Sequence, residues 1–222
     1  MEYKTAIFDM DGTILDTLSD ITNAANAAMR FARTPERTKE EVRRFVGNGA
    51  YKLIERCLPA GTERRRIEEV LAFYRPYYET HAENKTAPYP GISSLLSALK
   101  LRGIRLAVVS NKPDGAVKRL AARYFHGLFD LAIGERPGLR VKPYPDLMEV
   151  AMGLLRADPA ETVYIGDSDV DIETAKNAGI SCISVSWGFR DEAFLKRSGA
   201  SVIVKDADAL YEAITGDIRS LP

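Results

Sequence analysis

Residues that build disulfide frameworks and soft-metal sites are scarce in this sequence, which has two cysteines and two histidines among 222 residues. Cys57 and Cys182 show no metal-ligand spacing, and His81 and His126 stand far apart without a Cys or His neighbour. The pattern excludes a disulfide framework and gives no sign of a Cys/His metal site. We expect reduced core thiols, which are typical of the cytoplasm.

A surplus of one charge and long apolar runs are also missing. Lys plus Arg and Asp plus Glu number 31 each, so neither nucleic acid nor an acidic membrane is expected as the main partner. No apolar run reaches the roughly 20 residues of a membrane span. The chain runs from Met1 straight into a strand, without a secretory signal. The sequence therefore predicts a soluble cytoplasmic protein.

Short apolar or β-branched runs alternate with helical patterns along most of the chain. Strands are predicted at 4–9, 105–110, 131–134, 162–167, 181–185 and 201–204, and helices at 91–102, 114–124, 145–156, 169–178 and 206–215. Continuous apolar strands that alternate with helices are typical of a doubly wound, parallel, Rossmann-like α/β sheet. Ligands bind such sheets at the carboxyl ends of the strands.

Residues 17–86 do not show this alternation of strands and helices. They contain no convincing strand, and helical periodicity recurs at 18–32, 38–45, 50–58 and 63–82. Such a stretch is much longer than a crossover between two strands needs. We therefore predict an inserted helical domain at 17–86 and an α/β core domain formed by 1–16 and 87–222.

Polar residues follow the predicted strands at the points where these end. Asp9 and Asp11 close the first strand, Ser110 and Asn111 the second, and Asp167 the fourth. Lys142 precedes that fourth strand, and Asp171 lies one helical turn after Asp167. Asp11-Gly12 alone could be an ordinary turn. A parallel sheet brings strand ends into one crevice, so we expect these side chains to converge.

The same residues, in the same order, resemble the motifs of the haloacid dehalogenase superfamily. They are Asp9-x-Asp11-Gly12-Thr13, Ser110, Lys142-Pro143 and Gly166-Asp167-x-x-x-Asp171. The resemblance spans nearly the whole chain. Within the superfamily it is to the branch of phosphatases that have a helical cap. It is strongest to the phosphoglycolate phosphatases, on three further segments: Gly47-Asn48-Gly49, Asn111-Lys112-Pro113 and Trp187-Gly188-Phe189.

The resemblance implies a catalytic role for Asp9, Asp11 and Lys142. Asp9 is the predicted nucleophile, which accepts the phosphoryl group as an aspartyl phosphate. Asp11 is the predicted acid and base, and Lys142 neutralises the nucleophile and the phosphoryl oxygens.

Mg²⁺ is the implied cofactor, because hard oxygen ligands suit it. Its expected ligands are Asp9, the main-chain carbonyl of Asp11, Asp167 and Asp171. Asp171 has an alternative interpretation as a helix-start acid favoured by the dipole.

Substrate contacts are predicted at two places. Ser110, Asn111 and Thr13 could bind phosphate, although Thr13 also suits a turn and Asn111 the end of the strand. Gly47, Asn48 and Gly49 precede a helical stretch and could receive an anion through main-chain N–H groups. A plain helix–helix turn is the alternative there.

The predicted function is a Mg²⁺-dependent phosphomonoester hydrolase that works through an aspartyl phosphate, with 2-phosphoglycolate as favoured substrate. The alternatives are a phosphosugar mutase of the beta-phosphoglucomutase type and a broad-specificity small-molecule phosphatase or pyrophosphatase. The expected partner is a small phosphorylated metabolite, and a homodimer is left open.

Overall fold

The computed structural model describes residues 3–217, and these fall into two compact units. One unit holds the chain up to Leu15 together with the part from Pro88 onward, and the other holds Asp16–Ala87. We call them the core unit and the helical unit and describe each by itself. Two short strands that pair with each other, β2 (Leu15–Asp16) and β3 (Ala87–Pro88), stand where the chain passes between the units.

The core unit is built on a six-stranded sheet in which neighbouring strands run parallel. In sheet order its strands are β5 (Leu131–Glu135), β4 (Arg105–Pro113), β1 (Thr5–Phe8), β6 (Thr162–Gly166), β7 (Ser181–Val185) and β8 (Ile203–Val204). The first strand of the chain lies in the interior of the sheet, and Phe8 stands opposite both Val108 and Ile165. This sheet confirms the predicted parallel α/β fold.

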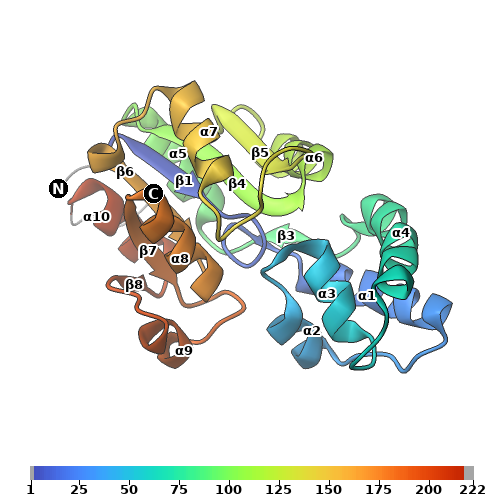
Figure 1. The fold of residues 1–222 in the computed structure, drawn as a ribbon. Helices are drawn as coiled ribbons and strands as arrows, with labels where there is room; N and C mark the ends of the chain where they lie inside the picture. Colours follow the sequence, from blue (N-terminus) through green and yellow to red (C-terminus); the bar gives the residue numbers. More distant parts are fainter. Residues whose placement is uncertain (1–2, 218–222) are drawn as a thin grey trace. The chain divides into compact units, whose positions relative to one another are not determined.

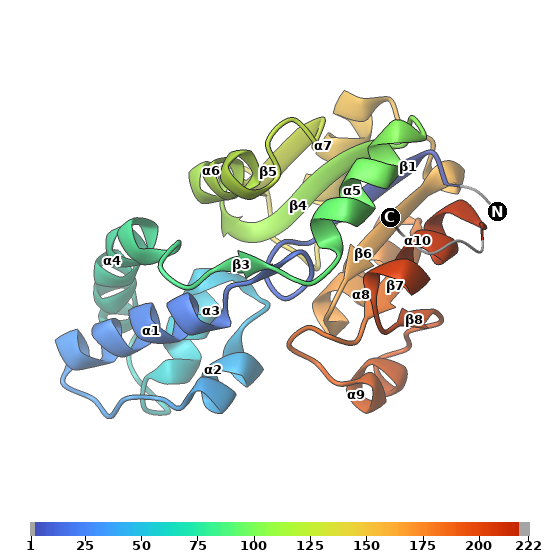
Figure 2. The same cartoon turned by 180° about the vertical axis from the view of Figure 1, so that it is seen from behind.

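Helices cover both faces of the sheet because successive strand residues point to opposite sides. Phe8 joins a buried apolar cluster with α5 (Ile92–Leu101), α6 (Asp114–Tyr124) and α10 (Ala207–Thr215). Its neighbour Ile7 joins a second cluster with α7 (Asp146–Leu155) and α8 (Asp169–Ala178). In Figure 1 α7 lies in front of the sheet, and in the reversed view of Figure 2 α5 does.

Cap residues fix where α8 begins and ends. Ser168 and Asp171 form a reciprocal capping box, and Gly179 closes the helix in the left-handed conformation. Such caps satisfy main-chain groups that the first and last turns leave unpaired. The helix therefore starts immediately after β6, so Asp167 and Asp171 stand together at one strand end.

Some elements differ from the sequence-based expectation. Strand β4 runs on to Pro113, beyond the predicted end at 110, because its pairing with β5 shifts register between Val109 and Pro113. The short helices η1 (Pro159–Glu161) and α9 (Glu192–Arg197) and the strands β2 and β3 were not predicted. Helix α9 is too short for a periodic pattern, and the Asp191 cap starts it.

The helical unit consists of α1 (Leu18–Ala32), α2 (Lys39–Phe45), α3 (Gly49–Cys57) and α4 (Arg64–His81). These bounds lie within one residue of the predicted helices. Within residues 3–217, no helix is both long and apolar enough to cross a membrane.

A buried carboxylate ties the two ends of the helical unit together. Asp20, in the first turn of α1, is 1% exposed. Its oxygens accept hydrogen bonds from the main-chain N–H groups of Lys85 and Thr86 at 2.8 and 2.9 Å and from the Thr86 hydroxyl at 2.9 Å. The carboxylate therefore holds the returning chain against α1.

We expect Asp20→Ala to lower the free energy of unfolding by about 2 kcal/mol or more, because it leaves buried donors without an acceptor. Urea unfolding measures the change. Glu68→Ala is the control: Glu68 pairs with Arg64 on an exposed surface, where such pairs contribute at most about 1 kcal/mol. Equal losses in the two variants would contradict this role for Asp20.

Candidate active site

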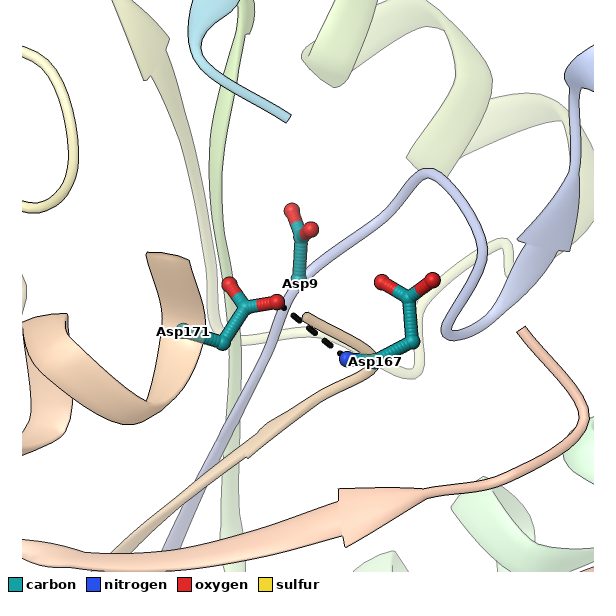
Figure 3. A group of neighbouring side chains, drawn as sticks. All are labelled: Asp9, Asp167 and Asp171. Carbon is teal, nitrogen blue, oxygen red and sulfur yellow. Dashed lines mark hydrogen bonds between the residues drawn. The ribbon is translucent and has the colours of Figure 1, made fainter. Parts of the chain in front are cut away.

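Three acidic side chains converge at the carboxyl ends of β1 and β6. Asp9 directly follows β1, Asp167 directly follows β6, and Asp171 lies in the first turn of α8. One carboxylate oxygen of each lies within 4.8 Å of the others, and all three residues are buried. Figure 3 shows the three side chains grouped beyond the strand ends. The sheet topology therefore unites acids that are up to 162 positions apart (171 − 9).

Lys142 is the cation at the centre of this group. Its ammonium lies 3.0 Å from Asp9 Oδ1 and 2.7 Å from Asp171 Oδ1, and its side chain is 3% exposed. The same ammonium donates to the Tyr164 hydroxyl at 2.8 Å, and that hydroxyl lies 3.0 Å from Asp171 Oδ1. A buried ammonium needs such partners to offset its lost hydration. Lys142 is therefore fixed between two acids.

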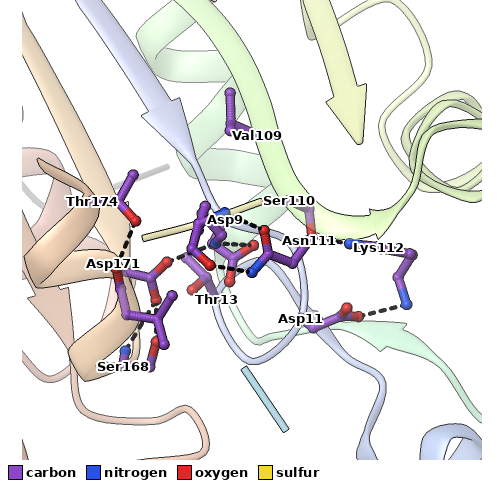
Figure 4. A network of polar contacts seen from close by, with 12 residues as sticks. Asp9, Asp11, Thr13, Val109, Ser110, Asn111, Lys112, Ser168, Asp171 and Thr174 are labelled. Atoms are coloured by element: carbon purple, nitrogen blue, oxygen red, sulfur yellow. Dashed lines mark hydrogen bonds and ion pairs between the residues drawn. The ribbon is translucent and has the colours of Figure 1, made fainter. Parts of the chain in front are cut away.

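Protein donors engage both oxygens of Asp171. Oδ1 receives Lys142, while Oδ2 accepts the Ser168 hydroxyl at 2.7 Å and the main-chain N–H groups of Ser168 and Asp167 at 3.1 and 3.2 Å. Asp171 thus joins the lysine to the turn between β6 and α8, and the Ser168 contacts are visible in Figure 4.

Asp167 sits in a cradle that only glycines allow. Its Oδ2 accepts the Phe189 N–H at 2.6 Å. A Cβ atom added at Gly12 would lie 2.3 Å from this oxygen, and one at Gly188 would lie 2.4 Å from it. Thr13, which is buried, approaches Oδ1 with its hydroxyl at 3.4 Å. The close approach of the main chain thus holds the Asp167 carboxylate in place. Thr13 lies beside the same carboxylate.

Burial and repulsion by neighbouring acids disfavour the charged forms of Asp9 and Asp167. Burial raises the pKa of Asp9 from 3.8 to about 7; Lys142 opposes the shift, while Asp171 and Asp11 add to it. Burial, and then Asp171 and Asp9, also raise the pKa of Asp167 well above its usual value. Burial alone would lower the pKa of Lys142, but Asp171 and Asp9 raise it above its usual value. One lysine does not balance three carboxylates, and carboxylate oxygens suit a hard divalent cation.

Asp11 has a different cation. Its Oδ1 lies 2.9 Å from the ammonium of Lys112, and their side chains are 15% and 2% exposed. Lys112 belongs to the part of β4 that extends beyond the predicted strand. Figure 4 shows this pair beside Asp9 and Ser110. Ser110 itself is buried at the same strand end.

Asn111 is engaged with the chain around Lys142. Its Oδ1 accepts the Lys142 N–H at 2.8 Å, and its Nδ2 donates to the Lys142 carbonyl at 3.0 Å. This reciprocal pair fixes the backbone that carries the central lysine. Contact of Asn111 with a phosphate stays a prediction.

The structure brings most of the predicted site residues together in the core unit. These are Asp9, Asp11, Thr13, Ser110, Asn111, Lys142, Asp167 and Asp171. Gly47, Asn48 and Gly49 belong to the helical unit, where Asn48 precedes α3 and accepts a hydrogen bond from Arg56 at 2.8 Å. Their contact with a substrate stays a prediction.

Sequence reasoning missed the roles of Tyr164, Ser168 and Lys112. The signal for Tyr164 is its hydroxyl in the middle of an apolar strand, Thr162–Gly166. Lys112 lies in the segment Asn111-Lys112-Pro113, which contributed to the family resemblance, but nothing in the sequence identified Asp11 as its partner.

Residues 6–185 match the sequence model of a family described as haloacid dehalogenase-like hydrolase. The chain belongs to this family. The predicted membership in the haloacid dehalogenase superfamily is therefore confirmed.

Relatives and solved structures agree with the family assignment. A phosphoglycolate phosphatase of Cupriavidus necator is 32% identical over 94% of this hydrolase and 92% of its own length. One from Aquifex aeolicus is 32% identical over 84% and 86%. The crystal structure of a Lactobacillus delbrueckii protein, provisionally assigned as a phosphoglycolate phosphatase, is 40% identical with a TM-score of 0.94 and covers 98% of this chain and 100% of its own.

The raised pKa of Asp9 makes stability depend on pH. The folded protein holds this proton up to a pKa of about 7, whereas the ordinary value is 3.8. The unfolded chain binds fewer protons between these values, so the free energy of unfolding falls as pH rises through that range. We expect urea unfolding without divalent cations to show this decline, to which Asp167 also contributes, and Asp9→Asn to make the decline smaller. An identical slope in the variant would contradict the assignment.

Proposed function

We propose that this hydrolase is a Mg²⁺-dependent phosphomonoesterase that forms an aspartyl phosphate on Asp9 and favours 2-phosphoglycolate. The single observation that carries the mechanism is the ion pair of 3.0 Å between Asp9 and the buried Lys142, beside Asp167. The substrate is inferred from relatives named phosphoglycolate phosphatase. The separate, free cysteines Cys57 and Cys182 suit a reducing compartment, and we place the reaction in the cytoplasm.

The first step transfers the phosphoryl group to the enzyme. A carboxylate oxygen of Asp9 attacks phosphorus while the bond between phosphorus and the leaving oxygen breaks. Asp11 gives its proton to that oxygen, so the alcohol leaves neutral. Covalent catalysis divides one difficult hydrolysis into two easier steps.

The second step returns the enzyme to its starting state. Water attacks the phosphorus of the aspartyl phosphate, the acyl–phosphate bond breaks, and the Asp9 carboxylate is restored. Asp11 accepts the proton that the water loses, and inorganic phosphate is released. The same side chain thus acts as acid and then as base.

Positive charge and hydrogen bonds must offset the anions that meet here. Lys142 faces Asp9 directly, and Asp171 holds that lysine in place. Ser110 would donate its hydroxyl to a phosphoryl oxygen. Asp9, Asp167 and the main-chain carbonyl of Asp11 would hold Mg²⁺, which supplies further positive charge to the phosphoryl oxygens. Because both Asp171 oxygens accept protein donors, we assign Asp171 to positioning rather than to direct ligation.

The helical unit is proposed as the cap that selects the substrate and keeps water out. The support is the family resemblance together with its compact form as an insertion, Asp16–Ala87. Gly47-Asn48-Gly49 would then offer main-chain N–H groups to an anion at the start of α3.

Two variants separate the steps when p-nitrophenyl phosphate is the substrate, because its leaving group needs little help from an acid. We expect Asp9→Asn to lower phosphate release by about a thousandfold or more. Asp11→Asn should release about one p-nitrophenol per site in a burst and then turn over slowly, because the water lacks its base. Stopped-flow absorbance measures both.

Glu192→Gln, on the exposed surface with Lys196, is the control and should behave like the parent. Unchanged turnover in Asp9→Asn would overturn the mechanism. Isomerised sugar phosphate in place of free phosphate would favour the mutase alternative.

Metal binding can be measured without an activity assay, from the melting temperature of the protein. We expect Mg²⁺ to raise the melting temperature, and to raise it more at about pH 8 than at about pH 5, because protons compete for the buried carboxylates. Asp167→Asn should reduce this shift, whereas Glu173→Gln, exposed on α8, should leave it intact. Differential scanning fluorimetry measures the shift. A shift that is the same at both pH values would contradict the proposed ligands.

A further inference from the structure

Tyr164 is a buried tyrosine in the middle of β6, and the two catalytic steps give it no task. Its ring packs in the apolar cluster that includes Ile7 and Val109. Its hydroxyl lies among polar groups instead: 2.8 Å from the Lys142 ammonium, 3.0 Å from Asp171 Oδ1 and 3.2 Å from the Val109 carbonyl oxygen. Burying a hydroxyl within an apolar strand is costly unless it is hydrogen-bonded, so these contacts decide whether a tyrosine is tolerated there.

The ammonium of Lys142 has three protons to donate. Two of them go to hydrogen bonds, with the Tyr164 hydroxyl at 2.8 Å and with Asp171 Oδ1 at 2.7 Å. The third is left for Asp9, whose Oδ1 lies 3.0 Å from the same nitrogen. Tyr164 and Asp171 thus anchor the ammonium, and one N–H remains for the nucleophile.

Charge explains why a neutral hydroxyl suits position 164. The ammonium already lies between two carboxylates, Asp9 and Asp171, and an oxygen of Asp167 is within 4.8 Å of theirs. A further acid would add to the repulsion among these groups. An apolar residue would leave an ammonium proton without an acceptor on a lysine side chain that is only 3% exposed. A tyrosine accepts that hydrogen bond without adding charge.

Lys142 must keep its direction while the phosphoryl group is transferred. Under the proposed function, on which this inference rests, the Asp9 carboxylate loses its charge when it becomes an aspartyl phosphate. The ion pair with Asp9 then no longer holds the ammonium, which is carried on a flexible four-carbon chain. Tyr164 and Asp171 take no part in that change. We propose that Tyr164 is a positioning residue that, together with Asp171, holds the Lys142 ammonium beside Asp9 before and during phosphoryl transfer.

The ammonium can be observed directly by NMR of protein whose lysines are labelled with ¹⁵N. We expect a sharp ammonium signal for Lys142, because burial slows the exchange of its protons with water, and Lys142→Arg identifies this signal by removing it. Tyr164→Phe removes only the hydroxyl and should shift and broaden the signal. Thr162→Val, which removes another buried hydroxyl from the same strand, is the control and should leave the signal unchanged.

Phosphate affinity separates positioning of the lysine from a general effect on the fold. Isothermal titration calorimetry with inorganic phosphate and Mg²⁺ should show a roughly tenfold lower affinity in Tyr164→Phe, the effect of losing a charged hydrogen bond. In a Lys142→Met background the same substitution should cause little further loss, because the group that it positions is gone. The kcat/KM for p-nitrophenyl phosphate should fall by a similar factor in Tyr164→Phe alone. Melting curves verify that each variant is folded.

The outcomes of these experiments are distinct. An unchanged Lys142 signal, or a phosphate affinity unchanged in Tyr164→Phe, would overturn the inference and leave the phosphatase mechanism standing. Equal losses of affinity with and without Lys142 would also overturn it, because Tyr164 would then act only on the fold. Wild-type protein that releases no phosphate from p-nitrophenyl phosphate, or Asp9→Asn that releases it at the wild-type rate, would refute the proposed function instead.

Discussion

The buried ammonium of Lys142 is the interaction on which the rest of the site depends. It contacts Asp9 and Asp171 and is hydrogen-bonded to Tyr164, so it links the end of β1 and the middle of β6 with the first turn of α8. Without this cation, three carboxylates at one sheet edge would repel each other in a place with little water. Asn111 fixes the main chain of the lysine from β4. The contacts that compensate charge in the site therefore also connect neighbouring elements of the sheet.

Glycines contribute by leaving space rather than by making contacts. Gly12 and Gly188 allow the main chain to close around Asp167, and Gly166 does the same for Asp171. These positions keep both carboxylates in place, although burial raises the pKa of the Asp167 carboxyl well above its usual value. The site therefore keeps its acids close together through rigid backbone. Under the proposed function this arrangement would be preorganised for a cation and a phosphoryl group, because the acids and the lysine are already held close together.

Sequence patterns predicted the architecture well because each element carries its own periodicity or cap. The helices of the helical unit and the parallel strands of the core unit fall close to their expected limits. The misses have local reasons. Helix α9 and strands β2 and β3 are too short to show a period, and β4 is extended by a register shift against β5. Only pairing with a neighbouring strand could reveal that extension.

What the sequence predicted by itself is the set of candidate site residues: Asp9, Asp11 and Asp167 follow predicted strands, Asp171 lies in the first turn of a helix, and Lys142 precedes the fourth predicted strand. What only the tertiary structure decided is how these groups are paired. Lys112 faces Asp11, Tyr164 bridges Lys142 and Asp171, and Asn111 holds the main chain of Lys142. These partners lie up to 101 positions apart (112 − 11). Their choice follows from the order of strands in the sheet and from charge burial, which no local pattern encodes.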